Sequence, residues 1–273
     1  MNRLPMAKRV AVVKALVEGC SIRSTVRLTG VAKNTIVKLL AELGAACTRY
    51  QDATLRDLPC KRLQADEIWS FVGSKDKNLT DEQKGNGLGS IWTWTVICAD
   101  TKLIPTWRIG GRDAGVAYEV MQDVAARLRN RVQLTTDGHK PYLEAVEAAF
   151  GADIDYAMLQ KLYGAEPGSE TRYSPAVCIG TKVEEITGTP NAQHISTSYV
   201  ERQNLSMRMS MRRFTRLTNA FSKKVENHAA AIALYFMYYN FGRVHQTLRV
   251  TPAMEAGVAA HVWSIEEIVG LLE

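Results

Sequence analysis

The chain has 273 residues, of which 46% are hydrophobic and 23% charged, and a formal net charge of +6 at pH 7. This length can bury a full core and predicts one medium-sized domain with a smaller one. No apolar stretch is long enough for a signal peptide or a transmembrane helix, so we expect no membrane partner and a cytoplasmic location. The five cysteines form no Cys-x-x-Cys pair, which excludes a zinc knuckle and a disulfide framework and indicates reduced thiols.

The positive charge is concentrated in two blocks. Residues 1–49 hold nine Lys or Arg residues against two acidic ones, and residues 201–224 hold seven against Glu201 alone. Such blocks are the usual electrostatic footprint of a protein that binds a phosphate backbone. For either block by itself, a solvated helix face that only keeps the chain soluble is the alternative.

The first block has the pattern of a helix-turn-helix. Helices are predicted over residues 6–18, 22–28 and 32–43, with Gly19 ending the first and Ser21 capping the second. The start of the third helix is where a recognition helix meets the major groove, and it carries Lys33, Asn34, Thr35 and Lys38. A three-helix interaction module without a DNA role is the alternative.

Three β-rich runs follow a predicted linker. The linker covers residues 47–62, which contain a proline and mixed charge. The runs cover residues 63–72, 91–98 and 103–110, and the first of them contains Asp66. Three consecutive strands, joined by a polar loop and then a short turn, favour an antiparallel meander.

A helical crossover then leads to a fourth strand. The helix is predicted over residues 114–129 and the strand over 131–136, directly before Asp137. Such a strand is parallel to the first, and parallel neighbours place their carboxyl ends at one edge of the sheet. We therefore expect Asp66 and Asp137 to lie side by side. A helix and a fifth strand, over 141–150 and 154–163, complete an α/β fold with a mixed five-stranded sheet flanked by helices.

The rest of the chain divides into an insertion and helices. Residues 164–195 contain repeated glycines and prolines around two short β-like runs, and are predicted to form a small hairpin beside the cleft. Glu201 lies in the first turn of a predicted helix, an apolar helix covers 225–241, and a helical tail covers 246–273.

Asp66, Asp137 and Glu201 are the candidate chemical residues. A carboxylate within or at the end of a buried strand is costly unless something pairs with it. Hard divalent cations take oxygen ligands, and two of them can clamp both the attacking and the leaving oxygen of a phosphodiester. The pattern therefore indicates phosphoryl transfer on nucleic acid. Glu67 is next to Asp66 but should point to the opposite face of the strand, so we expect it to be a poor ligand.

The third carboxylate has competing interpretations. Ser198-Tyr199-Val200-Glu201 fits a capping box, in which the glutamate bonds back to the amide of the cap, so a structural role is one alternative. Four other acids lie closer to Asp137 in the sequence, namely Glu166, Glu170, Glu184 and Glu185. They fall in the segment punctuated by glycine and proline, whereas a metal ligand needs a rigid element, which favours Glu201.

Four motifs, taken in order, resemble a known family. They are the strand around Asp66, Thr136-Asp137-Gly138-His139, Tyr199-Val200-Glu201-Arg202-Gln203-Asn204, and Tyr239-Asn240-Phe241-Gly242-Arg243-Val244-His245-Gln246-Thr247-Leu248 with Pro252 and Glu255 after it. With the helix-turn-helix before them, they resemble the DDE transposases of bacterial insertion sequences, in the retroviral-integrase-like, RNase H-fold superfamily. The spacing from Asp137 to Glu201 is longer than in the compact members, which agrees with an insertion.

The resemblance implies an RNase H-like catalytic domain over 63–245, preceded by a helix-turn-helix DNA-binding domain over 1–46 and followed by the tail at 246–273. It implies metal-dependent cleavage and joining of DNA, with the three acids holding two Mg²⁺ ions, for which Mn²⁺ can substitute. The implied partners are double-stranded DNA, as element ends and as target, and further copies of the chain assembled on it. The implied location is the bacterial cytoplasm, in association with the nucleoid.

Further basic residues follow the third acid. Arg208 lies two helical turns after Glu201 on the same face, and the resemblance implies that it meets a phosphate near the scissile bond. The basic surface continues through Arg202, Arg212, Arg213, Arg216, Lys223 and Lys224. Two other functions stay open: a structure-selective nuclease of the same fold, which cuts without joining, and a helix-turn-helix regulator with an inactive catalytic domain.

Overall fold

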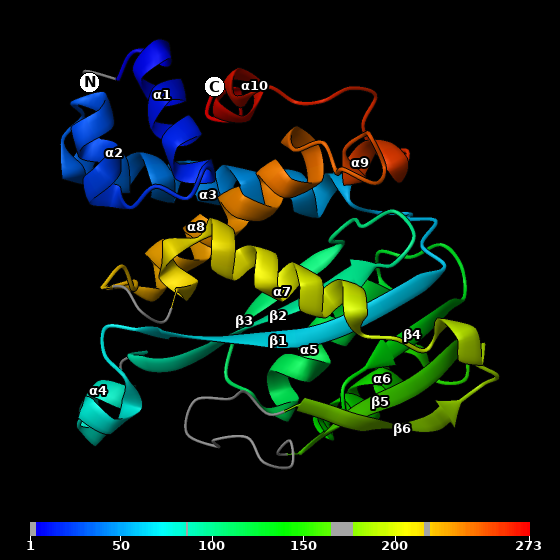
Figure 1. The fold of residues 1–273 in the computed structure, drawn as a ribbon. Coiled ribbons are helices and arrows are strands. Elements are labelled where there is room, and N and C mark those ends of the chain that lie inside the picture. Colours follow the sequence, from blue (N-terminus) through cyan, green and yellow to red (C-terminus); the bar gives the residue numbers. More distant parts are fainter. Residues whose placement is uncertain (1–3, 86, 165–176, 216–218) are drawn as a thin grey trace.

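The computed structural model describes residues 4–85, 87–164, 177–215 and 219–273. Within these ranges the chain has an α/β architecture, with a mixed sheet of six strands and helices against both of its faces (Figure 1). The strands are β1 (Arg62–Val72), β2 (Gly89–Cys98), β3 (Thr106–Gly110), β4 (Val132–Thr136), β5 (Ile154–Gly164) and β6 (Val177–Thr187). Their order across the sheet is β3-β2-β1-β4-β5-β6.

The strand directions follow the expected pattern in the centre of the sheet. β1 pairs antiparallel with β2, and β2 pairs antiparallel with β3, which confirms the meander. β4 lies on the other side of β1 and is parallel to it, and β5 is parallel to β4. Each of these parallel connections contains a helix, as a crossover requires.

A sixth strand replaces the hairpin expected in the insertion. β6 runs antiparallel to β5 at the edge of the sheet, with Tyr156 opposite Thr187 and Gly164 opposite Val177. The prediction of five strands is therefore wrong, because the second half of the insertion forms one strand that pairs with β5 instead of with itself. The part of the insertion at 165–176 lies outside the described residues.

Helices cover both faces of the sheet. They are α5 (Ala114–Ala125) and α6 (Pro141–Phe150) on one face, and α7 (Ser198–Ser210) and α8 (Val225–Met237) on the other. Ala65 of β1 packs in a buried cluster with Tyr142 of α6, whereas Ile68 packs in a second cluster with Val200 of α7 and Phe236 of α8. The alternation of side chains along β1 separates the two clusters. Single-turn elements in the connections are η1 (Asp76–Asn78), α4 (Asp81–Gly85), η2 (Ala192–His194) and η3 (Arg212–Phe214).

The N-terminal block folds into α1 (Met6–Val17), α2 (Ile22–Thr29) and α3 (Lys33–Thr54). The Ser21 hydroxyl accepts a hydrogen bond from the backbone N–H of Ser24 and caps α2, and Gly30 ends α2 in the left-handed region. α3 continues to Thr54, so the linker predicted over 47–62 is wrong in its first half. Residues 55–61 make the connection to β1.

Packing against α8 explains the length of α3. A Cβ on Gly44 would lie 2.5 Å from Cα of Ala230, so the two helices touch backbone to backbone. Further along, Nε2 of Gln51 donates to the carbonyl of Ala233 at 3.3 Å. Burial of this face stabilises turns of α3 whose local sequence does not predict a helix. One buried cluster accordingly runs from Val12 in α1 to the sheet, and the N-terminal helices share the core of the rest of the chain.

The C-terminal part closes the fold over α1. It contains η4 (Tyr238–Gly242), α9 (Pro252–Glu255) and α10 (Ile265–Gly270). The Asn240 side chain accepts from the backbone N–H of Ile104 and donates to the Ile104 carbonyl, both at 3.0 Å, which fixes η4 to the β2–β3 connection. α10 lies next to α1 in Figure 1, and Arg9 pairs with Glu273 at 2.9 Å. None of the helices in the described ranges has the length and apolar character needed to cross a membrane.

Candidate active site

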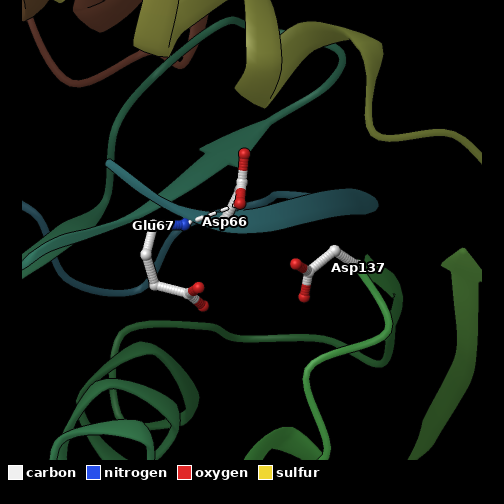
Figure 2. A group of neighbouring side chains, drawn as sticks. All are labelled: Asp66, Glu67 and Asp137. Atoms are coloured by element: carbon white, nitrogen blue, oxygen red, sulfur yellow. Dashed lines mark hydrogen bonds between the residues drawn. The ribbon is translucent and has the colours of Figure 1, made fainter. Parts of the chain in front are cut away.

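Asp66 and Asp137 lie side by side at the point where β4 ends next to the middle of β1. The last residues paired between these strands are Ala65 and Thr136, and each aspartate is the next residue of its chain segment. In Figure 2 the Asp137 carboxylate is turned toward Asp66 and Glu67 on β1. The arrangement follows from the parallel pairing, because equivalent positions of neighbouring parallel strands reach the same edge.

Glu67 is the third member of this group. One ligand oxygen each from Asp66, Glu67 and Asp137 lies within 4.8 Å of the others (Figure 2). Glu67 leaves β1 on the face opposite to Asp66, as expected, but its carboxylate still lies close to those of the two aspartates. No feature of the sequence beyond its place next to Asp66 identifies it.

The end of β4 explains why Glu67 reaches the site. Past the pair Ala65 and Thr136, the described residues place no strand beside β1 on this side, and Asp137 occupies the space. The side chains of Asp66 and Glu67 leave β1 on opposite faces, and the Glu67 carboxylate turns toward Asp137 (Figure 2). The alternation along a strand fixes the direction of Cβ and leaves the end of a long side chain free to turn.

Backbone and amide groups hold the two aspartates. Oδ1 of Asp66 accepts from the N–H of Glu67 at 2.8 Å, and Oδ2 accepts from the side-chain amide of Asn204 in α7 at 2.9 Å. Oδ1 of Asp137 accepts from the N–H of His139 at 2.9 Å. Burial, followed by the negative charges of Glu67 and Asp137, raises the pKa of Asp66 to about 7. The cluster is thus short of positive charge.

Arg112 is the cation inside the cluster. Its Nε lies 3.0 Å from Oε2 of Glu67, and its Nη2 lies 3.5 Å from Oδ2 of Asp137. The guanidinium also lies over the ring of Trp92, 4.9 Å from the centroid. Sequence reasoning missed Arg112. Its only signal is its position two residues after the end of β3, a strand that β2 separates from β1 in the sheet.

Glu201 lines the same cleft but stands apart from the group of three. The cleft has a volume of about 560 Å³, and its lining includes Asp66, Asp137 and Glu201. Oε2 of Glu201 accepts from Nζ of Lys161 at 2.5 Å, and Oε1 accepts from the hydroxyl of Thr197 at 2.7 Å. Both carboxylate oxygens are therefore engaged with the chain's own donors.

The capping box is absent at Glu201, and two of the competing acids do not line the cleft. α7 begins at Ser198 with Thr197 as its cap residue, and no capping side-chain bond is present there, so the capping box is wrong. Glu184 and Glu185 lie on β6 opposite Met158 and Ala157 and do not line the cleft. Glu166 and Glu170 fall outside the described residues.

The predicted DNA-contact residues divide between this cleft and a second groove. Arg208 lines the cleft beside Glu201. A groove of about 950 Å³ lies between the N-terminal helices and the 210–224 segment, and its lining includes Lys33, Asn34, Arg212, Arg213, Lys223 and Lys224. We call it the basic groove. Thr35, Lys38 and Arg202 line neither space, and Lys38 pairs with Glu42 at 3.8 Å. Arg216 lies outside the described residues.

A buried histidine fixes one wall of the basic groove to the sheet. Nε2 of His228 bonds to the Ser70 hydroxyl of β1 at 3.1 Å, and its Nδ1 bonds to the Ser222 hydroxyl at 2.9 Å. Arg213 donates to the same Ser222 hydroxyl at 2.7 Å, and burial lowers the pKa of its guanidinium to about 10. The Arg213 side chain thus has a hydrogen-bond partner within the protein.

The donor set fits a divalent cation. Three carboxylates converge, and no nitrogen ligand is among the three, which suits Mg²⁺ or Mn²⁺. Two buried oxygens at this site have no hydrogen-bond partner among the described residues: Oε1 of Glu67, within the group, and Oδ1 of Asn204, beside it. Buried acceptors without a partner are costly, and a cation would satisfy them.

No family model and no curated protein matches the sequence. Among solved structures, the chain is similar to the cryo-EM structure of a piggyBac transposase synaptic complex with hairpin DNA, with 11% sequence identity and a TM-score of 0.42. The similarity covers 98% of this chain and 69% of that one. A TM-score below 0.5 does not establish a common fold.

Proposed function

We propose that the chain is a DDE-type DNA transposase, which binds the ends of a mobile element and catalyses metal-dependent cleavage and strand transfer. The observation that carries the proposal is the placement of Asp66 and Asp137 on adjacent parallel strands, in one cleft with Glu201. The order and directions of β1 to β5 support an RNase H-like catalytic domain, with β6 added at its edge. The ordered motifs around the three acids support the same assignment.

Asp66, Asp137 and Glu201 would hold two Mg²⁺ or Mn²⁺ ions in this proposal. Bound there, the ions would activate the attacking oxygen, first of water and then of a DNA 3′ end, and stabilise the leaving oxygen. The chain's own contribution is to hold the ligands on rigid elements, with Asp66 fixed by the Asn204 amide and Asp137 by the N–H of His139. Positioning of this kind supplies much of the catalysis in phosphoryl transfer.

Two cations of the chain would serve the DNA near the acids. Arg208 lines the cleft with Glu201 and would contact a phosphate beside the scissile bond. Lys161 pairs with Glu201 in the absence of other cations, and would be released to a phosphate when Glu201 takes a metal ion. A flexible ammonium suits such an exchange, because it has no fixed bonding plane.

The basic groove supports DNA binding by both blocks of positive charge. Lys33 and Asn34, at the start of α3, line it from one side, and Lys223 and Lys224 line it from the other. We propose that the helix-turn-helix reads the element ends with Lys33, Asn34, Thr35 and Lys38, while Arg202, Arg208, Arg212, Lys223 and Lys224 contact phosphates. Base contacts specify the sequence and phosphate contacts position the duplex. Two copies of the chain would pair two ends on DNA.

A strand-transfer assay tests the proposal. The full chain is incubated with Mg²⁺, a labelled duplex from the DNA that flanks its coding sequence, and a supercoiled plasmid target. Joined products are expected from the natural chain and from Glu185→Gln, and none from Asp66→Asn or Asp137→Asn. Cleavage without joining would assign a nuclease instead. Specific end binding without either reaction would assign a DNA-binding regulator.

A further inference from the structure

We propose that Glu67 is a fourth carboxylate of the site, which binds a divalent cation together with Asp66 and Asp137, and that Arg112 is the internal cation which that ion displaces. The inference rests on the metal dependence in the proposed function and adds a ligand and a competitor to it. The resemblance in the sequence assigns a role to neither residue.

Distance is the first reason. The ligand oxygens of Asp66, Glu67 and Asp137 lie within 4.8 Å of one another, and Glu201 is not part of this group. One cation can therefore reach the three oxygens with small side-chain movements, since a Mg²⁺ or Ca²⁺ ion binds oxygen at about 2–2.6 Å. Glu201 is held by Lys161 and Thr197 in the same structure.

Unsatisfied buried atoms are the second reason. The Glu67 side chain is 0% exposed, and its Oε1 has no hydrogen-bond partner among the described residues. The Tyr142 hydroxyl lies beside this carboxylate and has no other partner among the described residues. Oδ1 of Asn204, whose amide nitrogen donates to Asp66, is also buried without a hydrogen-bond partner. Oε1 of Glu67 and Oδ1 of Asn204 are thus buried acceptors that receive no hydrogen bond. Their position within and beside the group of three carboxylates indicates a place for a cation.

The position of Arg112 is the third reason. Its guanidinium bridges Glu67 and Asp137, which are two of the three proposed ligands, and it is the only cation paired with them in the described part of the chain. The Arg112 side chain is 38% exposed and rests on the ring of Trp92. It can therefore move toward solvent along an apolar surface. A divalent ion among the same carboxylates would repel the guanidinium and drive this movement.

A purely structural ion pair is the alternative. In that case Glu67 and Arg112 would stabilise each other and neither would affect metal binding. Thermal stability alone does not separate the two roles, because removing one partner from a buried pair is destabilising in both. The affinity for a metal ion separates the two roles. Loss of a ligand lowers this affinity and loss of a competing cation raises it, whereas loss of a purely structural ion pair does neither.

The experiment is a titration of the full chain with Mn²⁺ in the absence of DNA, followed by the electron paramagnetic resonance signal of free Mn²⁺. Glu67→Gln should bind Mn²⁺ at least ~10-fold more weakly, as expected for loss of a group that holds the metal. Arg112→Gln should bind it about fivefold more tightly, because one positive charge has left the site. Glu185→Gln is the matched control and should bind as the natural chain does.

The double variant Glu67→Gln with Arg112→Gln tests the inference even if Glu67→Gln folds poorly, because it removes both partners of the ion pair and leaves neither charge without the other. It should bind Mn²⁺ at least ~10-fold more weakly than Arg112→Gln alone. Equal affinity of these two variants, or no gain in affinity for Arg112→Gln over the natural chain, would overturn the inference. If Mn²⁺ binding depends on Glu67 and Arg112 while no cleavage or joining is found, the inference stands and the proposed function fails.

Discussion

The ammonium of Lys161 lies 2.5 Å from Oε2 of Glu201, so the third predicted carboxylate is paired with a cation of its own chain. Lys161 comes from β5 and Glu201 from α7, 40 residues later. The pair leaves Glu201 in the cleft with Asp66 while balancing its charge. A pair that is partly open to solvent contributes little to stability, which makes the role of Glu201 testable without loss of the fold.

Glu201→Gln should preserve thermal stability and lower DNA cleavage at least ~100-fold, because a metal ligand is lost while the size of the side chain is kept. Glu185→Gln, on the edge strand β6, should change neither quantity. Cleavage rates in Mg²⁺ and circular dichroism melts measure both effects. A Glu201→Gln protein that cleaves at a near-normal rate would remove Glu201 from the proposed site.

Asp66→Asn should stabilise the metal-free chain at pH 8. The pKa of Asp66 is raised to about 7 in the folded state, so its proton is bound more tightly in the folded than in the unfolded chain. The stability that this proton contributes is complete below the unfolded pKa of 3.8 and is lost as the pH rises to about 7. The variant should gain up to about 4 kcal/mol at pH 8 and nothing at pH 3.

Urea unfolding at the two pH values, with a chelator present, measures this difference. Asp153→Asn serves as the control, because its side chain is 81% exposed, and it should show no comparable dependence on pH. A lower stability of Asp66→Asn at pH 8 would contradict the expected crowding of negative charge in the cluster.

His228→Leu should destabilise the chain at pH 8 by about 2 kcal/mol, because the buried Ser70 and Ser222 hydroxyls each lose a partner. Burial lowers the pKa of His228 from 6.5 to about 3, so the folded chain holds it neutral. Its contribution is present above pH 6.5 and is lost as the pH falls toward 3. Urea unfolding should therefore show a smaller penalty at pH 5 than at pH 8, and a penalty that grows on acidification would be the contrary result.

Lys33→Glu and Lys223→Glu should weaken DNA binding in a non-additive way, because both residues line the basic groove and would meet the same stretch of duplex. Fluorescence anisotropy with a labelled duplex at several salt concentrations measures the affinities, and each change should reduce the salt slope by about 1. Lys77→Glu, in η1 and outside the groove, is the control and should combine additively with Lys33→Glu. Additive effects of Lys33→Glu and Lys223→Glu would mean that the two blocks bind separate pieces of DNA.

Gly44→Ala should destabilise the chain by about 1–3 kcal/mol, because the added methyl would overlap the backbone of Ala230. In an isolated helix or a linker, the same change would be neutral or stabilising. Gly270→Ala is the control, since nothing lies within 4 Å of its added Cβ. Thermal melts of the two variants decide whether α3 is packed on α8 in solution. An unchanged melting temperature for Gly44→Ala would mean that the two helices do not pack closely at this point.

Local signals determined much of the fold from the sequence alone. The Ser21 cap and Gly30 set the limits of α2, and the β-rich runs with their polar connections set the meander of β1 to β3. The crossover helix made β4 parallel to β1, and this direction alone brought Asp66 next to Asp137. Each of these features depends on residues that are close in sequence or on a general rule of chain handedness.

Only the tertiary structure decided the features that join distant segments. β4 stops opposite Ala65, and this opens the edge around which Glu67 turns into the site. α3 is extended by α8, β6 pairs with β5, Lys161 meets Glu201, and the two basic blocks meet in one groove. A periodic pattern encodes the direction in which a side chain leaves the backbone. The end of an element and the partner of a side chain depend on packing between surfaces far apart in the sequence, which the local pattern does not contain.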